Sequence, residues 1–318
     1  MFILFKKRGF SEFVSDTFSF FKQNGKHFFK NYLIMNGIPL LVITVLIYFI
    51  FKVYFEILFG GSINAEPDFN IFSGYFNNNM GLIIGTLIVF VVMLFTLTLL
   101  NFAYPAVYLE LYEQNKGNNF TIRDIAKQIK LKAGRIISFS IGGFFILFPL
   151  TILVFGLLIL SIFIIIGIPL IIIGVPAYVS WITLSFYEHI NNDKGFFSAL
   201  RKGFQLVKEQ FWPTVGSTII CYLIIQAIVT IVALVPYVIG MISLFTSTTS
   251  GKSAVDPEQT GFFATMMIIA MVVSTLANYI MNNLLITNQG IIYYSIREIN
   301  ENNTPQSDIE LIGTSHSE

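Results

Sequence analysis

The stretch from Ile136 to Tyr187 contains no charged residue, and this feature limits what the chain can fold into more than any other. A helix that crosses the hydrocarbon core of a bilayer needs about 20 mostly apolar residues. The stretch is too long for one such helix, so it has to form a hairpin of two spans. Only 12% of the 318 residues are charged, which is about half the usual share in soluble domains. The sequence therefore predicts an integral membrane protein.

The remaining apolar runs complete a set of six predicted spans. They are Tyr32–Phe51, Gly81 to about Tyr104, the two halves of the uncharged stretch, Trp212 to about Phe245, and Gly261 to about Leu285. The turn inside the uncharged stretch is expected between Ser161 and Pro169, because Gly167 and Pro169 are its best local breakers. Pro236 is expected to kink or end the fifth span. The sixth helix is expected to continue to Ile299.

Lysine and arginine are distributed unevenly between the predicted loops. All but two of the 19 lie before the first span, in the loops after the second and fourth spans, or in the tail. Only Lys52 and Lys252 fall in the other loops. Because cytoplasmic loops carry an excess of Lys and Arg, we expect a multi-pass protein of a bacterial inner (plasma) membrane with both termini in the cytoplasm. No secretory signal is expected, because the first residues lack a continuous apolar core and a cleavage site.

Basic, aromatic-rich segments precede the first, third and fifth predicted spans. Apolar residues recur in them at helical spacing: Phe10, Val14, Phe18, Phe21 and Phe28; Ile122, Ile125, Ile129 and Ala133; Phe197, Leu200, Phe204, Val207 and Phe211. The cations outside these stripes are Lys22, Lys26, Lys30, Arg123, Lys127, Lys130, Arg201, Lys202 and Lys208. Such patterns predict amphipathic helices. We expect them to lie in the cytoplasmic interface near anionic headgroups, or to pack beneath the bundle, in preference to forming a dedicated ligand or partner site.

The pairs of spans that follow these segments end alike. Each exit has tyrosine, then Glu113, Glu188 or Glu298, then an asparagine-rich turn. We therefore expect an all-α fold in one membrane domain, residues 1–299, with a three-fold pseudo-repeat of units at about 9–113, 119–188 and 195–298. Residues 300–318 are expected to form a short cytoplasmic tail, in which "SDIELIG" looks like a truncated fourth copy.

Polar residues inside spans are the usual markers of function in membrane proteins. Ser274, Asn278 and Asn282 share one face of the sixth span, and Gln226 lies in the fifth. These residues are candidates for a polar pathway or binding groove, although hydrogen bonding between helices is the favoured interpretation. Asn101 in the second span is a further polar residue of this kind. No span carries Lys, Arg or Asp near its middle, which argues against an ion-coupled pump.

Glu188 and His189 form an adjacent acid–histidine pair, which could serve acid–base chemistry or bind a metal. Neighbouring residues on a helix do not face each other, and the chain has only three histidines. It also has no phosphate-binding loop, dinucleotide fingerprint or nucleophile elbow. We therefore expect no enzymatic activity, no cofactor and no metal, and we expect Glu188 to pair locally with a lysine or arginine. Gly81 and Gly85 have the spacing that permits close helix approach.

The segment "YEHINNDKGFFSALRKGFQLVKEQFWPTVGSTIICYL" resembles the membrane domain attached to some bacterial glycerophosphodiester phosphodiesterases, and related stand-alone membrane proteins of unknown function. The matching positions are Glu188, Ala199, Gly203, Leu206, Lys208 and Phe211–Trp212. The segments "FSEFVSDTFSFFKQNGKHFF" and "YYSIREINENN" are also similar to that group. The catalytic barrel of the phosphodiesterases is a large soluble domain, for which the residues after Ile299 leave no room. The resemblance therefore implies a six-span helical domain without the hydrolase activity.

These patterns favour a non-enzymatic integral membrane protein with a structural or accessory role, exerted by binding membrane lipids, a partner protein or a second copy of the chain. The alternative is a transporter or channel for a lipid-like or small uncharged solute. A net charge of +1 gives no reason to expect nucleic acid as a partner. A water-accessible cavity lined by Gln226, Asn278 and Asn282 would favour transport, whereas mutual pairing of these residues in a dry bundle would favour the accessory role.

Overall fold

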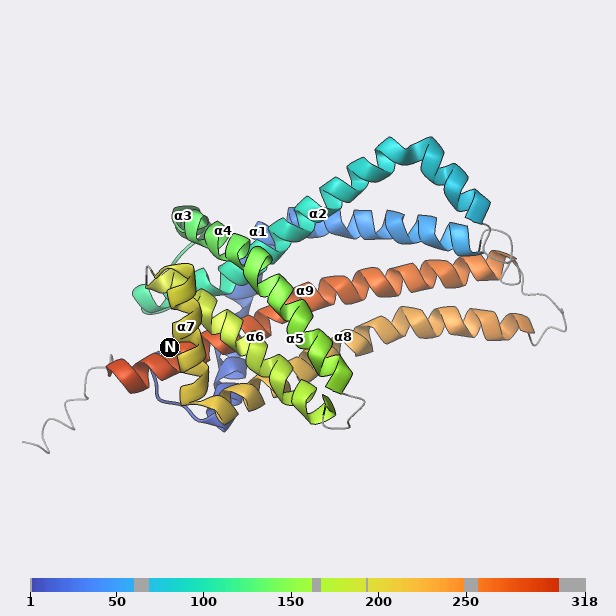
Figure 1. Ribbon diagram of the computed structural model, residues 1–318. Helices are drawn as coiled ribbons and strands as arrows, with labels where there is room; N and C mark the ends of the chain where they lie inside the picture. The colour runs from blue at the N-terminus through green and yellow to red at the C-terminus, as the bar shows by residue number, and fades with distance from the viewer. Residues whose placement is uncertain (1, 60–68, 162–166, 193, 249–256, 303–318) are drawn as a thin grey trace, which may run out of the picture. The chain divides into compact units, whose positions relative to one another are not determined.

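The computed structural model describes residues 2–59, 69–161, 167–192, 194–248 and 257–302, and all regular structure in these ranges is helical (Figure 1). The elements are α1 (Phe10–Phe59), α2 (Phe69–Gln114), α3 (Ile122–Leu131), α4 (Ala133–Gly142), a π-helical turn η1 (Gly143–Leu147), α5 (Phe148–Ser161), α6 (Gly167–Asn191), α7 (Phe196–Glu209), α8 (Phe211–Thr248) and α9 (Pro257–Glu301). The helices α4, η1 and α5 follow one another without a gap in the chain.

Six helical segments of the described residues are long and apolar enough to cross a membrane. They are Phe10–Phe55, Asn79–Gln114, Ala133–Ser161, Gly167–Asn191, Phe211–Phe245 and Gln259–Glu301. The predicted all-α architecture with six spans is thereby confirmed at the level of helix length and composition. In the hairpin predicted for the uncharged stretch, α4, η1 and α5 together form the first span and α6 forms the second. Most of the predicted turn, residues 162–166, lies outside the described residues.

One boundary differs from the sequence-based expectation. The basic segment before the first span is not a separate helix, because α1 runs without interruption from Phe10 through Pro39 to Phe59. The fifth span ends at Phe245 as predicted, and of the two effects expected of Pro236 it does not end the helix, since α8 continues to Thr248. Proline removes one backbone hydrogen bond, but a long apolar helix held by its neighbours can tolerate that loss. The sixth helix extends past the apolar run to Glu301, in agreement with the predicted extension.

The buried faces of the amphipathic segments coincide only in part with the predicted stripes, of which Phe28, Ile125, Leu200 and Val207 are buried. In α7 the buried residues are Ala199, Leu200, Gly203, Leu206 and Val207, while Phe197 and Phe204 are 68% and 51% exposed. In the first part of α1 the buried residues are Phe13, Thr17, Phe20, Asn24 and Phe28, and Phe10 and Phe18 are exposed. In α7 small and aliphatic residues face the interior, whereas in α1 the buried face combines the rings of Phe13, Phe20 and Phe28 with the polar side chains of Thr17 and Asn24.

The helix α3 begins at a capping box. The carboxylate of Asp124 accepts hydrogen bonds from the backbone N–H and the hydroxyl of Thr121, both at 2.8 Å. These bonds satisfy a donor that would otherwise be left free at the helix start. They favour the charged carboxylate, so the pKa of Asp124 lies below its ordinary value, with the backbone N–H as the largest cause.

The chain divides into two compact units. Unit 1 consists of Met1–Asn31, Phe102–Tyr222 and Leu284–Glu318, and unit 2 consists of Tyr32–Asn101 and Leu223–Asn283. Each unit assembles segments that are far apart in the sequence, whereas the predicted repeat consists of consecutive segments. The three-fold pseudo-repeat and the single domain over residues 1–299 therefore stay predictions.

Unit 1 is held by an aromatic core and by close helix contacts. The rings of Phe28 and Tyr108 are fully buried with centroids 4.8 Å apart. The helices α6 and α7 lie side by side, and Gly203 of α7 is so close to Ser185 of α6 that a Cβ at Gly203 would lie 2.7 Å from the Ser185 backbone nitrogen. Gly290 of α9 is similarly close to Tyr187. Small residues are needed wherever helix backbones approach this closely.

Two cations fasten the start of α4 to the end of α6, also within unit 1. The side chains of Lys132 and Arg135 both donate to the backbone carbonyl of Ile190, at 3.2 and 3.0 Å. Lys132 also forms an ion pair with Glu110 of α2. Both cations therefore satisfy a carbonyl in the last turn of a helix, which intrahelical bonds leave open.

Unit 2 contains the central parts of four of the apolar segments and has an apolar outer surface. Large side chains such as Leu82, Leu87, Ile231 and Val235 are exposed along α2 and α8. This is the surface expected for helices that face lipid tails. The helices α8 and α9 approach closely at Gly240, where a Cβ would lie 2.9 Å from the Met266 side chain.

Candidate functional site

A cavity of about 380 Å³ lies within unit 2, in the part of the chain predicted to cross the membrane. We call it the amide cavity. Its lining comprises Asn101 of α2, Val229 of α8, and Ser274, Thr275, Asn278, Tyr279 and Asn282 of α9. The volume lies in the usual range for small-molecule sites.

The structure brings three of the four predicted intramembrane polar residues to this cavity. Ser274, Asn278 and Asn282 line it, as expected for residues on one helix face. Gln226 is half-buried but does not line the cavity, because α8 turns Val229 toward it instead. Tyr279 contributes to the lining although the sequence pattern gave no signal for it.

The hydrogen-bonding state of the lining residues falls into two classes. Asn101 Oδ1 accepts hydrogen bonds from the Tyr32 hydroxyl at 3.0 Å and from Asn283 Nδ2 at 3.3 Å. The hydroxyl of Ser274 donates to the Ala270 carbonyl of its own helix. These groups are satisfied by protein, and Asn101 forms the hydrogen bonds between helices that are expected for polar residues inside spans.

The amides of Asn278 and Asn282 belong to the other class. Neither makes a hydrogen bond within the described part of the chain, and both line the cavity. Asn278 is exposed and Asn282 is half-buried, so their amides face the medium around the helices. Within a bilayer that medium contains no water to satisfy them. The two amides are therefore available to hydrogen-bond with water or with a bound molecule in the cavity.

Charge is absent from the described residues that line the amide cavity. Their side chains offer neutral donors and acceptors, which suit hydroxyl, ester or amide groups better than ions. None of them is arranged as a nucleophile next to a base. The arrangement can bind and orient an uncharged polar group between apolar helices.

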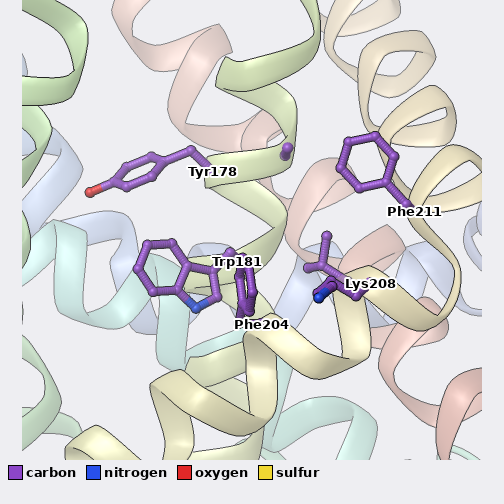
Figure 2. A pocket seen from close by; sticks show the side chains of 7 residues that line it. Tyr178, Trp181, Phe204, Lys208 and Phe211 are labelled. Atoms are coloured by element: carbon purple, nitrogen blue, oxygen red, sulfur yellow. The ribbon is translucent and has the colours of Figure 1, made fainter.

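A second cavity, of about 410 Å³, lies in unit 1 and was not predicted from the sequence. We call it the aromatic pocket. Its lining comprises Ala177, Tyr178 and Trp181 of α6, Phe204, Val207 and Lys208 of α7, and Phe211 at the start of α8. Figure 2 shows Trp181 beside Phe204, with Phe211 on the other side of the pocket. The rings of Trp181 and Phe204 meet edge to face with centroids 6.1 Å apart.

Glu188 and His189 point to different partners. The Glu188 carboxylate is buried, forms an ion pair with Lys194 at 2.7 Å, and accepts hydrogen bonds from Asn192 Nδ2 at 2.8 Å and the Tyr293 hydroxyl at 3.0 Å. His189 Nε2 lies 3.1 Å from the Ser138 hydroxyl instead. Glu188 therefore pairs with a nearby lysine as expected, although Lys194 precedes α7 and does not belong to the interfacial helix itself.

The nine predicted interfacial cations differ from the cations that fasten the fold. Eight of them are exposed and Lys202 is half-buried; the set is Lys22, Lys26, Lys30, Arg123, Lys127, Lys130, Arg201, Lys202 and Lys208. None forms an ion pair within 4.0 Å among the described residues. Two of them lie close to other groups of the chain, Lys127 near the Asp124 carboxylate and Lys208 over the Phe204 ring.

In the described ranges, no group of three or more His, Cys, Asp or Glu side chains could hold a metal ion. Cys221 is a buried free thiol in α8. Comparison with known proteins adds no identity: no family model, curated protein or solved structure matches this chain.

Proposed function

We propose that this chain is a non-enzymatic integral membrane protein with an accessory role, and that it binds a lipid-like molecule whose uncharged polar part occupies the amide cavity. The observation that carries the proposal is the pair of unpartnered amides, Asn278 and Asn282, lining a cavity in an apolar unit. A neutral hydroxyl, ester or amide group would satisfy them. The apolar outer surface of unit 2 suits acyl chains attached to such a group.

A second candidate function uses the same cavity. A small uncharged solute would form the same hydrogen bonds with Asn278 and Asn282, and a transporter or channel for it would need no charged side chain there. The two functions differ in what stays bound, because an accessory lipid remains on the protein while a transported solute passes through it.

We expect the double substitution Asn278→Leu with Asn282→Leu to reduce the amount of bound neutral lipid roughly tenfold. Two hydrogen bonds are lost, each worth about 0.5–1.5 kcal/mol, and a factor of ten corresponds to about 1.4 kcal/mol. The measurement is native mass spectrometry of the full chain, purified in native lipid. The matched control is Gln226→Leu, which removes an amide from α8 outside the cavity lining and should leave the bound lipid unchanged.

Vesicle assays separate the two candidates. Glycerol entry into vesicles that contain the protein should equal entry into empty vesicles if the cavity holds a lipid. Faster entry that the double substitution abolishes, with no retained lipid, would replace the accessory role by transport. Equal lipid retention by the parent, the double variant and Gln226→Leu would contradict binding in the amide cavity.

We propose further that the protein resides in a bacterial inner membrane with both termini in the cytoplasm, and that α3 and α7 lie at the cytoplasmic surface. The asymmetric distribution of Lys and Arg supports this orientation. The exposed, unpaired cations of α3 and α7 are consistent with contact to anionic headgroups. A partner protein, a second copy and the resemblance to the phosphodiesterase membrane domains stay predictions.

The orientation can be tested with single cysteines, because Cys221 is buried and is the only cysteine in the sequence. Asn118→Cys and Ser198→Cys lie at exposed positions in the loop before α3 and in the first turn of α7, and Asn77→Cys lies at an exposed position before the second span. A membrane-impermeant maleimide added to intact cells should label Asn77→Cys only. Labelling of Asn118→Cys or Ser198→Cys before cell disruption would reverse the proposed orientation.

A further inference from the structure

We infer that the aromatic pocket of unit 1 is a binding site for one anionic phospholipid, with an acyl chain between the rings and the phosphate at Lys208. The inference concerns a different cavity and a different ligand class from the amide cavity, so it does not rest on the proposed function.

The lining of the pocket selects an apolar occupant. The polar atoms of its aromatic residues are already used: Trp181 Nε1 donates to the Leu200 carbonyl at 2.8 Å, and the Tyr178 hydroxyl bonds to Thr151 and donates to the Leu147 carbonyl. What remains toward the cavity is ring faces and edges, the methyl groups of Ala177 and Val207, and one ammonium group. Such a lining suits a hydrocarbon chain that carries a negative charge at one end.

Lys208 supplies the positive end of the pocket. Its ammonium lies 5.6 Å from the ring centroid of Phe204 and the side chain is exposed. No carboxylate within 4.0 Å of it is found among the described residues, and the one acidic residue of α7, Glu209, accepts a hydrogen bond from Asn300 instead. The charge is therefore available, and an anion is its natural partner.

The residues on the exposed face of α7 indicate that the anion bound by Lys208 is the phosphate of a lipid. Aromatic rings and cations alternate along it at intervals of three or four residues: Phe197, Arg201, Phe204, Lys208 and, at the start of α8, Trp212. Helices that lie in a bilayer interface combine rings in the acyl boundary with cations at the phosphates. The pocket opens beside this face because Phe204 and Lys208 belong to both.

Contact with a lipid chain can be read from Trp181, because the sequence contains only one other tryptophan, Trp212. In a Trp212→Phe background, Trp181 is the sole tryptophan, and lipids with brominated acyl chains quench its fluorescence only on close contact. The full chain in detergent is titrated with brominated phosphatidylglycerol or with brominated phosphatidylcholine of the same chains. We expect half-maximal quenching at about fivefold lower mole fraction of the anionic lipid, the factor that one cation near a phosphate provides.

Two substitutions test whether the preference for the anionic lipid depends on Lys208. Lys208→Gln should abolish it, while Lys202→Gln removes the same charge from the same helix outside the pocket lining and should retain it. Equal loss in both variants would show that diffuse surface charge, and no site, attracts the lipid. Equal quenching by both lipids in the Trp212→Phe parent, or quenching by neither, would also overturn the inference. Unchanged elution of each variant in size-exclusion chromatography verifies that it is folded.

Discussion

Gly203→Val is expected to prevent α7 from docking on α6. A Cβ at this position would meet the side-chain oxygen of Ser185 and would lie 2.7 and 2.8 Å from its backbone nitrogen and Cα. A backbone cannot rotate away as a side chain can, so the two helices would have to separate. Overpacking a well-packed interior by a methyl group costs about 1–3 kcal/mol, and valine adds more than one.

The measurement is the temperature at which half of the detergent-purified protein is lost from the monodisperse peak. We expect Gly203→Val to lower it by roughly 5–10 °C and Gly203→Ala to lower it by less. The control is Gly134→Ala in α4, where a Cβ would meet nothing within 4 Å. That variant should be neutral or slightly stabilising, because alanine favours helix over glycine. A melting temperature for Gly203→Ala equal to that of the parent would contradict the close contact between α6 and α7.

Glu188→Leu is the second substitution with a large expected effect. It would leave the Tyr293 hydroxyl and the Asn192 amide without their shared acceptor and would remove the partner of Lys194. A buried donor that loses its acceptor costs about 1–3 kcal/mol. Lys194 is 41% exposed and can turn to solvent, so most of the loss should come from the buried hydrogen bonds.

Glu188→Gln separates these contributions. Its side-chain oxygen can still accept from Tyr293 and Asn192, so we expect a loss of only about 1 kcal/mol in the same melting assay. Glu301→Leu serves as the control, because Glu301 is 43% exposed and pairs with Arg297 one turn away; such pairs contribute about 0.3–0.5 kcal/mol. Equal destabilisation by Glu188→Leu and Glu188→Gln would show that the charge matters and the hydrogen bonds do not.

The spans could be predicted because bilayer thickness sets a minimum length that uncharged runs such as Ile136–Tyr187 satisfy plainly. Which face of each helix is buried could not be predicted from the sequence. In a soluble helix an apolar stripe marks the interior, but in a membrane the outside is apolar too. Phe18 and Phe197 therefore carry the same signal as buried residues although they are exposed, and Thr17 and Gly203 are buried without giving any apolar signal.

The positions where helices approach closely could not be predicted from glycine spacing, for a related reason. Gly81 and Gly85 have the spacing of a packing motif, yet a Cβ at either would meet nothing within 4 Å. At Gly203 and Gly290 the glycine is required by a partner helix, and spacing within one helix cannot reveal that partner. Of the positions on which the predicted resemblance to the phosphodiesterase membrane domains rests, Ala199, Gly203 and Leu206 lie on the buried face of α7.

The candidate site was predictable in part. Ser274, Asn278 and Asn282 share a helix face by periodicity alone, and this places them together on one cavity wall. Whether a polar residue inside a span finds a hydrogen-bond partner depends on neighbouring helices, which the pattern of one helix cannot specify. Asn101 accepts hydrogen bonds from Tyr32 and Asn283, whereas Asn278 forms no hydrogen bond among the described residues. The aromatic pocket combines residues of α6, α7 and α8, so no pattern within a single segment of the sequence predicts it.

The bonds from Lys132 and Arg135 to the Ile190 carbonyl have a consequence for biogenesis. Both cations precede Ile190 in the chain, so during synthesis they emerge before the carbonyl to which they will bind. In the orientation proposed above, they belong to the positive loops that set the topology of the chain. Once α6 has been synthesised, the same two side chains donate hydrogen bonds to its Ile190 carbonyl and hold α4 against α6. Replacing either one would therefore disturb two successive events, the choice of sidedness during translation and the closure of the finished bundle.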